Sequence, residues 1–133
     1  EVEGILRIIE ALKKDVPVFC VIDEIFRGTN PVERVAASAA ILEYINKYNA
    51  ITFVATHDRE LTDMLKDKYE FRYFTENVDK KNGMTFDYKM KKGISKTRNA
   101  IKVLEYVGYP KEITDYSKEY AKELDKISWS TYL

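Results

Sequence analysis

Several features that mark other protein classes are scarce in this 133-residue chain, and each absence narrows what it can be. Its single cysteine, Cys20, lies inside an apolar run, so no intrachain disulfide can form and a reducing, cytoplasmic setting is expected. No apolar run has the length that spans a bilayer, and no signal-peptide pattern opens the chain, so we expect no membrane. The 22 basic and 22 acidic residues cancel, which leaves no net charge that would attract nucleic acid.

Two further absences concern phosphate binding and the start of the chain. The sequence contains no G-x-x-x-x-G-K-[ST] loop, the motif whose backbone cradles phosphates in one large class of nucleotide-binding proteins. Glu1 opens directly into a helical pattern, with neither a helix cap nor an initiator methionine. We therefore predict that the chain is a piece of a longer protein, and that any phosphate loop lies upstream of Glu1.

The first half of the chain alternates between helical and strand patterns. Apolar residues recur at helical spacing from Val2 to Leu12 and again from Pro31 to about Lys47. Two short apolar runs, Val18 to Ile22 and Ala50 to Ala55, are typical of strands buried on both faces. A strand, one crossover helix and a second strand predict two parallel strands and an α/β fold.

The second half of the chain predicts a hairpin and then a helix pair. Alternating residues over 70–78 and 84–91 flank an Asn-Gly dipeptide, which is a strong hairpin signal. Helical patterns follow over 96–107 and 111–127. An apolar seam on the last helix suggests an oligomerisation element, or a helix that simply covers the hairpin; it comprises Ile113, Tyr116, Tyr120, Leu124 and Ile127.

Each of the two predicted strands is followed directly by a pair of polar residues. Asp23 and Glu24 come after the first strand, and Thr56 and His57 come after the second. Parallel strands end at the same edge of a sheet, where open α/β sheets bind ligands, so these residues are expected to converge. ATP-hydrolysing proteins place a magnesium-associated aspartate and a water-activating carboxylate at such an edge.

Simpler interpretations of the same residues stay open at this point. The two carboxylates can be solvated, and the histidine can be a partly exposed side chain bonded to nearby backbone. The loop that follows, Arg27 to Asn30, can reach across a dimer or serve only as a connector, and Thr29 or Asn30 can cap the next helix. A metal-dependent hydrolase using Asp23, Glu24 and His57 is a weaker alternative, because the residues lack zinc-like ligand spacing.

Four stretches resemble, in order along the chain, the C-terminal half of the ATPase domain of the MutS family of DNA mismatch-repair and related ATPases. They are Asp23 to Thr29, Ala55 to His57 followed by Glu60-Leu61, Lys92 to Lys96, and Val107 to Ile113. The resemblance extends to about Leu124 and implies the C-terminal part of an ABC-type P-loop NTPase domain, with ATP and Mg²⁺ as cofactors.

The resemblance also implies roles for individual residues. Asp23 would be the Walker B acid, which contacts Mg²⁺ through water, and Glu24 would be the catalytic base. His57 would contact the γ-phosphate and sense its loss, and Thr56 beside it would belong to the nucleotide site. The loop that meets a second subunit would include Thr29 and Asn30.

The implied organisation divides the chain in two. Residues 1–94 would be the ATPase part, and residues 95–133 would be a helix-turn-helix element that dimerises with a second copy. DNA would be bound through domains upstream. Because the phosphate loop is absent, we predict that this chain alone is inactive as an ATPase.

Two departures from the family pattern bear on the biological task. The stretch Asn30 to Glu33 lacks the usual Ser-Thr-rich continuation and is closer to a paralogous branch without mismatch recognition, and Asp58 stands where an aromatic residue often follows the histidine. A paralogue of that kind, or a non-catalytic dimerisation or interaction module, is therefore the alternative function.

Overall fold

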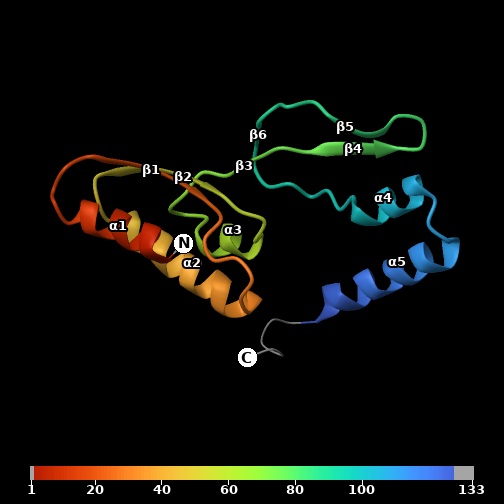
Figure 1. Cartoon of the computed structure of the whole chain (residues 1–133), viewed down its shortest axis with the longest axis horizontal. Helices are drawn as coiled ribbons and strands as arrows, with labels where there is room; N and C mark the ends of the chain where they lie inside the picture. The colour runs from red at the N-terminus through yellow and green to blue at the C-terminus, as the bar shows by residue number, and fades with distance from the viewer. Residues whose placement is uncertain (1, 128–133) are drawn as a thin grey trace. The chain divides into compact units, whose positions relative to one another are not determined.

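The computed structural model describes residues 2–127 as a mixed α/β chain (Figure 1). Its contacts divide the chain into two compact units, with the boundary between Glu70 and Phe71. Glu1 and residues 128–133, the end of the predicted dimerisation element, lie outside the described residues. Within residues 2–127, no helix combines the length and the apolar character that crossing a bilayer requires.

The first unit is built as the sequence predicted, with helices alternating with parallel strands. Its elements are α1 (Val2–Leu12), β1 (Val18–Asp23), α2 (Pro31–Ile45), β2 (Ala50–Ala55) and α3 (Glu60–Met64). The two strands pair in parallel and in register along their whole length, from Val18 opposite Ala50 to Asp23 opposite Ala55. Both strands therefore end at the same edge of the sheet.

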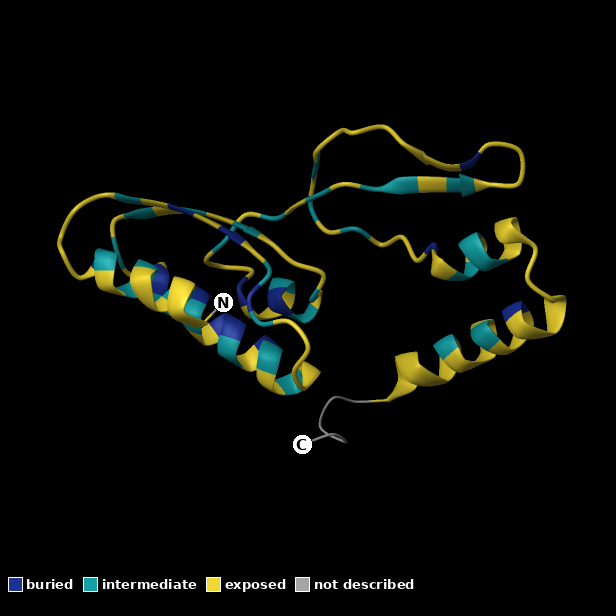
Figure 2. Ribbon diagram, viewed as in Figure 1, coloured by how far each residue is buried: buried dark blue, intermediate teal, exposed yellow. Residues whose placement is uncertain are grey.

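The core of this unit lies between the strands and the helices. The buried apolar residues come from the three helices, from β1 and from the segments that follow β1 and α3, whereas β2 is at most partly buried (Figure 2): Leu12, Cys20, Ile22, Ile25, Val35, Ala39, Leu42, Ile45, Leu61 and Leu65. The Tyr69 hydroxyl donates a hydrogen bond to the Leu42 carbonyl oxygen at 2.8 Å, and burial raises the pKa of this phenol to about 12.

The prediction that both strands are buried on both faces is wrong. Cys20 and Ile22 point into the core, but every second side chain on the opposite face is exposed. The exposed fractions are 67% for Phe19, 66% for Val21, 64% for Ile51 and 61% for Phe53. Within the first unit, α1 and α2 lie on one side of the two strands and leave the other face uncovered (Figure 1).

The second unit begins with the predicted hairpin, which is divided into two short ladders. β4 (Glu76–Asp79) pairs antiparallel with β5 (Gly83–Phe86), and β3 (Arg72–Tyr73) pairs antiparallel with β6 (Lys91–Lys92). The interruption has a backbone cause, because Tyr88 has a φ of 53°. This left-handed conformation cannot continue a strand.

The turn between β4 and β5 is closed by a side chain. The Asp79 carboxylate accepts hydrogen bonds from the backbone N–H groups of Lys81 at 2.8 Å and Asn82 at 2.7 Å. Gly83 follows with a φ of 70°, which completes a three-residue hairpin loop. Glycine also fits here because a Cβ would lie 2.6 Å from the ring of Tyr106.

Two helices complete the second unit, α4 (Ala100–Val107) and α5 (Lys111–Lys126). α4 begins later than the predicted residue 96 and packs against β4 and β5. Within this unit, α5 packs against α4, so α4 rather than α5 covers the hairpin. The predicted apolar seam of α5 is exposed, with fractions from 41% at Ile127 to 62% at Tyr120. Its role in oligomerisation stays a prediction.

Candidate functional site

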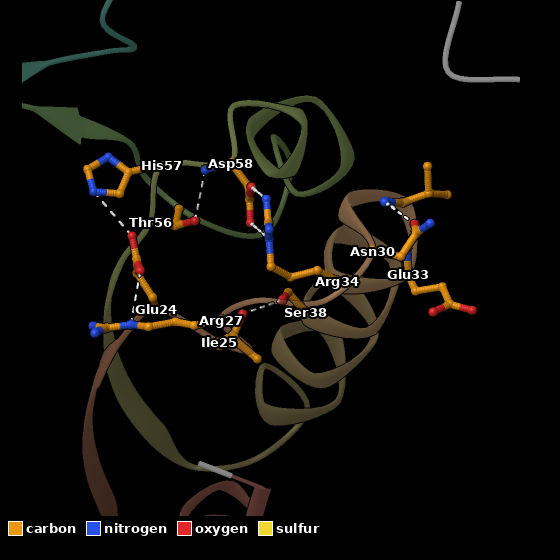
Figure 3. Close-up of polar contacts among 11 residues, drawn as sticks. Glu24, Ile25, Arg27, Asn30, Glu33, Arg34, Ser38, Thr56, His57 and Asp58 are labelled. Atoms are coloured by element: carbon orange, nitrogen blue, oxygen red, sulfur yellow. Dashed lines mark hydrogen bonds and ion pairs between the residues drawn. The ribbon is translucent and has the colours of Figure 1, made fainter. Parts of the chain in front are cut away.

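The candidate site lies at the edge where β1 and β2 end together (Figure 3). The ladder continues for one bond past Asp23, because the Glu24 N–H donates to the Ala55 carbonyl oxygen at 2.9 Å. This bond fixes Glu24 beside the start of the Thr56-His57 segment. Parallel pairing thereby brings together residues that are more than thirty positions apart in the sequence, as predicted.

Glu24 is the centre of the polar contacts at this edge. Its Oε1 lies 3.1 Å from Nε2 of His57, and its Oε2 lies 3.1 Å from Nε of Arg27. The Glu24 side chain is 25% exposed, whereas that of His57 is 96% exposed. The carboxylate is thus held in a defined place, while the imidazole extends into open space at the rim.

Asp23 precedes Glu24, but its side chain is far more exposed than that of Glu24. Its side chain is 79% exposed, and its Oδ2 lies 3.6 Å from Nη2 of Arg27. Arg27 therefore stands between the two acidic side chains and partly offsets their charge. Arg27 was expected only as part of the loop Arg27 to Asn30, and its contacts with the two acids were not predicted, although its position four residues after Asp23 and three after Glu24 is a usable signal.

The loop that carries these residues has a tightly folded backbone. Glu24, Phe26 and Gly28 have φ values of 58°, 57° and 70°, so alternate residues adopt the left-handed conformation. Such backbone is unfavourable for residues other than glycine and persists where surrounding contacts impose it. Here Ile25 is buried in the core, and its carbonyl oxygen accepts a hydrogen bond from the Ser38 hydroxyl at 3.5 Å.

Thr29 and Asn30 lie at the far end of this loop, where α2 begins. The Asn30 side chain caps α2, since its Oδ1 accepts from the N–H groups of Val32 at 2.9 Å and Glu33 at 3.3 Å. Thr29 is exposed and lines a cavity of about 350 Å³. No described contact joins Thr29 or Asn30 to Glu24 or His57, so the structure leaves these two predicted residues apart from the carboxylate–imidazole pair.

Thr56 and Asp58 shape the backbone on either side of His57. The Thr56 hydroxyl oxygen accepts a hydrogen bond from the Asp58 N–H at 3.0 Å. The Asp58 carboxylate accepts two hydrogen bonds from the guanidinium of Arg34, at 2.9 Å from Nε and 2.5 Å from Nη2. The hydrogen bond to Asp58 raises the pKa of Arg34 above its ordinary value.

Asp58 does not cap the helix that follows it. Arg59 occupies the N-cap position of α3 and makes no side-chain capping bond, while the carboxylate of Asp58 is engaged by Arg34 on α2. No local pattern reveals this pairing, because the two residues are 24 positions apart. Arg34 is thus a residue of the site that the sequence did not predict.

A cavity of about 320 Å³ lies at this edge of the sheet. Its wall contains the contacts of Glu24 with Arg27 and His57 and also the ion pair of Arg34 and Asp58. It is lined by Glu24, Ile25, Phe26, Arg27, Gly28, Arg34, His57 and Asp58. The wall combines carboxylates, guanidinium groups and an imidazole. Such a surface suits a charged, oxygen-rich ligand, which would meet Glu24 and His57, because Arg34 and Asp58 are already paired with each other.

The arrangement fits magnesium better than a transition metal. Among residues 2–127, no group of three or more histidine, cysteine, aspartate or glutamate side chains is placed to hold a metal ion. Mg²⁺ needs no such group, because it keeps several waters and is bound through one or two carboxylates and the phosphates of a nucleotide. The exposed carboxylate of Asp23 meets that requirement, whereas the hydrolase alternative with a three-residue metal site lacks support.

The sequence is similar to one protein-family model and to several known proteins. A sequence model of MutS domain V matches residues 1–125. A DNA mismatch repair protein MutS from Aquifex pyrophilus is 36% identical over 107 residues, which are 79% of this chain and 12% of that protein. The MutS of Finegoldia magna is 34% identical over 108 residues, 80% of this chain and 13% of that protein.

A second kind of relative matches over a longer stretch at lower identity. A protein named endonuclease MutS2, from Fusobacterium nucleatum, is 26% identical over 131 residues, which cover 93% of this chain and 16% of that protein. The chain thus spans between 12% and 16% of the length of these three relatives.

Proposed function

This chain belongs to the MutS family, and we propose that it is the C-terminal part of the ATPase domain of a DNA-binding protein that hydrolyses ATP. In this proposal the chain supplies the acid, the base and the γ-phosphate contact of the nucleotide site. The phosphate loop belongs to another part of the protein, because the chain contains no such motif.

The observation that carries the proposal is the pairing of Glu24 with His57. The glutamate Oε1 lies 3.1 Å from the imidazole Nε2, at the shared end of two parallel strands. This is the edge at which α/β sheets bind ligands, and the pair lines a cavity with basic groups beside it. A carboxylate held there can accept a proton from a water molecule that attacks a bound phosphoryl group.

Each residue then has a defined task. Glu24 takes the proton as the water oxygen forms a bond to the γ-phosphorus and the bond to the bridging oxygen of ADP breaks. Asp23 is the residue that would hold Mg²⁺ through water, and the ion, when bound, neutralises charge on the phosphate oxygens. His57 extends into the space where the γ-phosphate would lie, with Thr56 beside it in the nucleotide site.

The remaining assignments concern partners. We place residues 1–94 in the ATPase part and residues 95–133 in a dimerisation element, whose described portion exposes an apolar seam on α5. Thr29 and Asn30, at an exposed corner apart from Glu24, would meet the nucleotide of a second copy of the protein. DNA would be bound by other parts of the full-length protein, which is expected to work in the cytoplasm.

A second candidate is a MutS paralogue without mismatch recognition. The match to a protein named endonuclease MutS2 covers 93% of this chain, and the stretch from Asn30 to Glu33 departs from the mismatch-repair pattern. Binding of the full-length protein to mismatched and to fully paired duplexes separates the candidates. A mismatch-repair protein prefers the mismatch, whereas the paralogue binds both duplexes equally.

The proposal is tested by magnesium-dependent ATP hydrolysis in the full-length protein. Glu24→Gln removes the proton acceptor with little change in shape, so turnover is expected to fall by about two orders of magnitude or more. Glu10→Gln, a change of the same kind at an exposed position of α1, serves as the matched control and should keep the wild-type rate. Equal rates for Glu24→Gln and Glu10→Gln would refute the role of Glu24.

A further inference from the structure

The starting observation is an ion pair that joins the two loops of the candidate site. Arg34 lies in the first turns of α2, directly after the loop that carries Glu24. Asp58 directly follows His57. The Arg34 guanidinium donates two hydrogen bonds to the Asp58 carboxylate, at 2.9 Å from Nε and 2.5 Å from Nη2 (Figure 3).

The burial of this pair distinguishes it from the surface ion pairs of the same unit. The side chains of Arg34 and Asp58 are 25% and 14% exposed. Those of Lys68 and Glu43, whose ion pair measures 2.6 Å, are 37% and 51% exposed. A bidentate, largely shielded contact fixes both partners in one geometry, whereas exposed pairs contribute little.

The backbone around His57 depends on this contact. The N–H of Asp58 donates to the Thr56 hydroxyl, and the Asp58 carboxylate is tied to α2, so both flanks of His57 are fixed. The imidazole itself is 96% exposed and lies against Glu24 at its outer end. With so little packing around the ring, its position is set mainly by the backbone that carries it.

We infer that Arg34 and Asp58 are positioning residues, which hold His57 at the distance from Glu24 and the bound phosphate that hydrolysis requires. The inference rests on the proposed function of Glu24 and His57. Neither Arg34 nor Asp58 takes part in the chemistry. Their contact instead fixes the segment that follows β2, which carries His57, to α2. Loss of such a contact misplaces a reacting group, and small misplacements have large effects on rate.

The test uses steady-state ATP hydrolysis by the full-length protein. Asp58→Asn and Arg34→Gln are each expected to lower kcat about 10-fold, since misplacement by about 1 Å can cost up to 10²-fold. The double variant Arg34→Gln/Asp58→Asn should lose no more than either single variant, because both changes remove one contact. Glu43→Gln breaks a different ion pair of the same unit and should keep the wild-type kcat.

The decisive readout is dependence on His57. In a His57→Gln background, adding Asp58→Asn should leave kcat unchanged, because the residue to be positioned is already gone. A further 10-fold loss in that background, or a roughly 100-fold loss in the Arg34→Gln/Asp58→Asn variant, would overturn the inference, since the effects would then be independent.

Two outcomes separate this inference from the proposal on which it rests. If Glu24→Gln turns over ATP at the wild-type rate, both fall. If Glu24→Gln is inactive while Asp58→Asn is as fast as Glu43→Gln, only this inference falls. Should Asp58→Asn fail to fold, Arg34→Lys keeps the charge but loses the bidentate geometry, and a loss of about 3-fold is expected; an unchanged kcat then refutes the inference.

Discussion

At the scale of single residues, the backbone after β1 is the most unusual feature of the chain. Glu24 and Phe26 have φ values of 58° and 57°, in a region that costs a residue with a side chain about 1–2 kcal/mol. The intervening Ile25 is buried, and this anchoring balances the strain. The result is a loop that presents the Glu24 carboxylate toward the end of β2 instead of continuing along the strand.

Gly28 completes this alternation, and its replacement tests how far the loop depends on the left-handed conformation. Its φ is 70°, and a Cβ there would meet no atom within 4 Å. Gly28→Ala is therefore expected to lower the free energy of unfolding by about 1 kcal/mol through backbone strain alone. Urea unfolding of the chain measures this change.

Gly4 provides the control for that prediction. It lies in α1, and a Cβ at this position also meets no atom within 4 Å. Gly4→Ala is expected to raise stability by about 0.5–1 kcal/mol, because alanine favours a helix interior. Changes of the same sign for both variants would contradict the role given to the Gly28 backbone.

The candidate site was only partly predictable from the residues themselves. Asp23, Glu24 and His57 follow apolar runs, and the parallel pairing of those runs is enough to bring Glu24 and His57 together. The contact between Arg34 and Asp58 was not predictable, because it depends on the direction of side chains from separate elements 24 residues apart. Local patterns carry no information about such a contact.

At the scale of elements, the turn between β4 and β5 makes a prediction about pH. Hydrogen bonds from the backbone of Asn82 and of Lys81 hold the pKa of Asp79 below its ordinary value of 3.8. The ionised carboxylate therefore stabilises the folded turn above that ordinary pKa. This contribution is lost as the pH falls through the lower pKa of the folded state.

Asp79→Ala should consequently destabilise the chain at neutral pH and have a progressively smaller effect as the pH falls below about 4. Thermal unfolding across this pH range measures the difference from the wild-type chain. Asp67→Ala, at an exposed position outside the turn, serves as the comparison. A penalty for Asp79→Ala that stays constant down to pH values well below 3.8 would show that the carboxylate charge is not what closes the turn.

The elements differ in how well the sequence predicted them, and the reasons are physical. The helical spacing of apolar residues predicted α1, an apolar run predicted β2, and the strand-helix-strand order predicted the parallel pairing. The sequence did not predict that the hairpin is divided into two ladders. The division follows from the positive φ of Tyr88, and a tyrosine residue does not indicate a left-handed backbone. α4 begins at Ala100 instead of Lys96, after a segment in which Ser95 and Thr97 hydrogen-bond to each other.

At the scale of the whole molecule, the main departure from expectation is the uncovered face of the first unit. Phe19, Val21, Ile51 and Phe53 form a continuous apolar surface on β1 and β2, each more than 60% exposed. The aromatic rings of Phe19 and Phe53 contact each other with centroids 5.9 Å apart. The sequence predicted these residues to be buried, because an apolar run by itself does not tell which other elements cover a strand.

This surface should make the chain associate with itself as its concentration rises, because large exposed apolar patches tend to bind another apolar surface and so leave water. Phe53→Thr removes a ring from the uncovered face without entering the core, and threonine suits a strand. The variant is expected to shift sedimentation velocity profiles toward the monomer. Met64→Thr, which changes an apolar residue 55% exposed on α3, controls for a general loss of hydrophobicity. Equal association of both variants would contradict a role for this face.

The role proposed for Glu24, the base for ATP hydrolysis in a MutS-family protein, determines which nucleotide stays bound to the protein. Full-length Glu24→Gln is incubated with magnesium and ATP, freed of unbound nucleotide, and the nucleotide that stays on the protein is identified. Binding groups other than Glu24 are intact in this variant, so we predict that it retains ATP while the wild-type protein retains ADP. Retention of ADP by both proteins would contradict the claim.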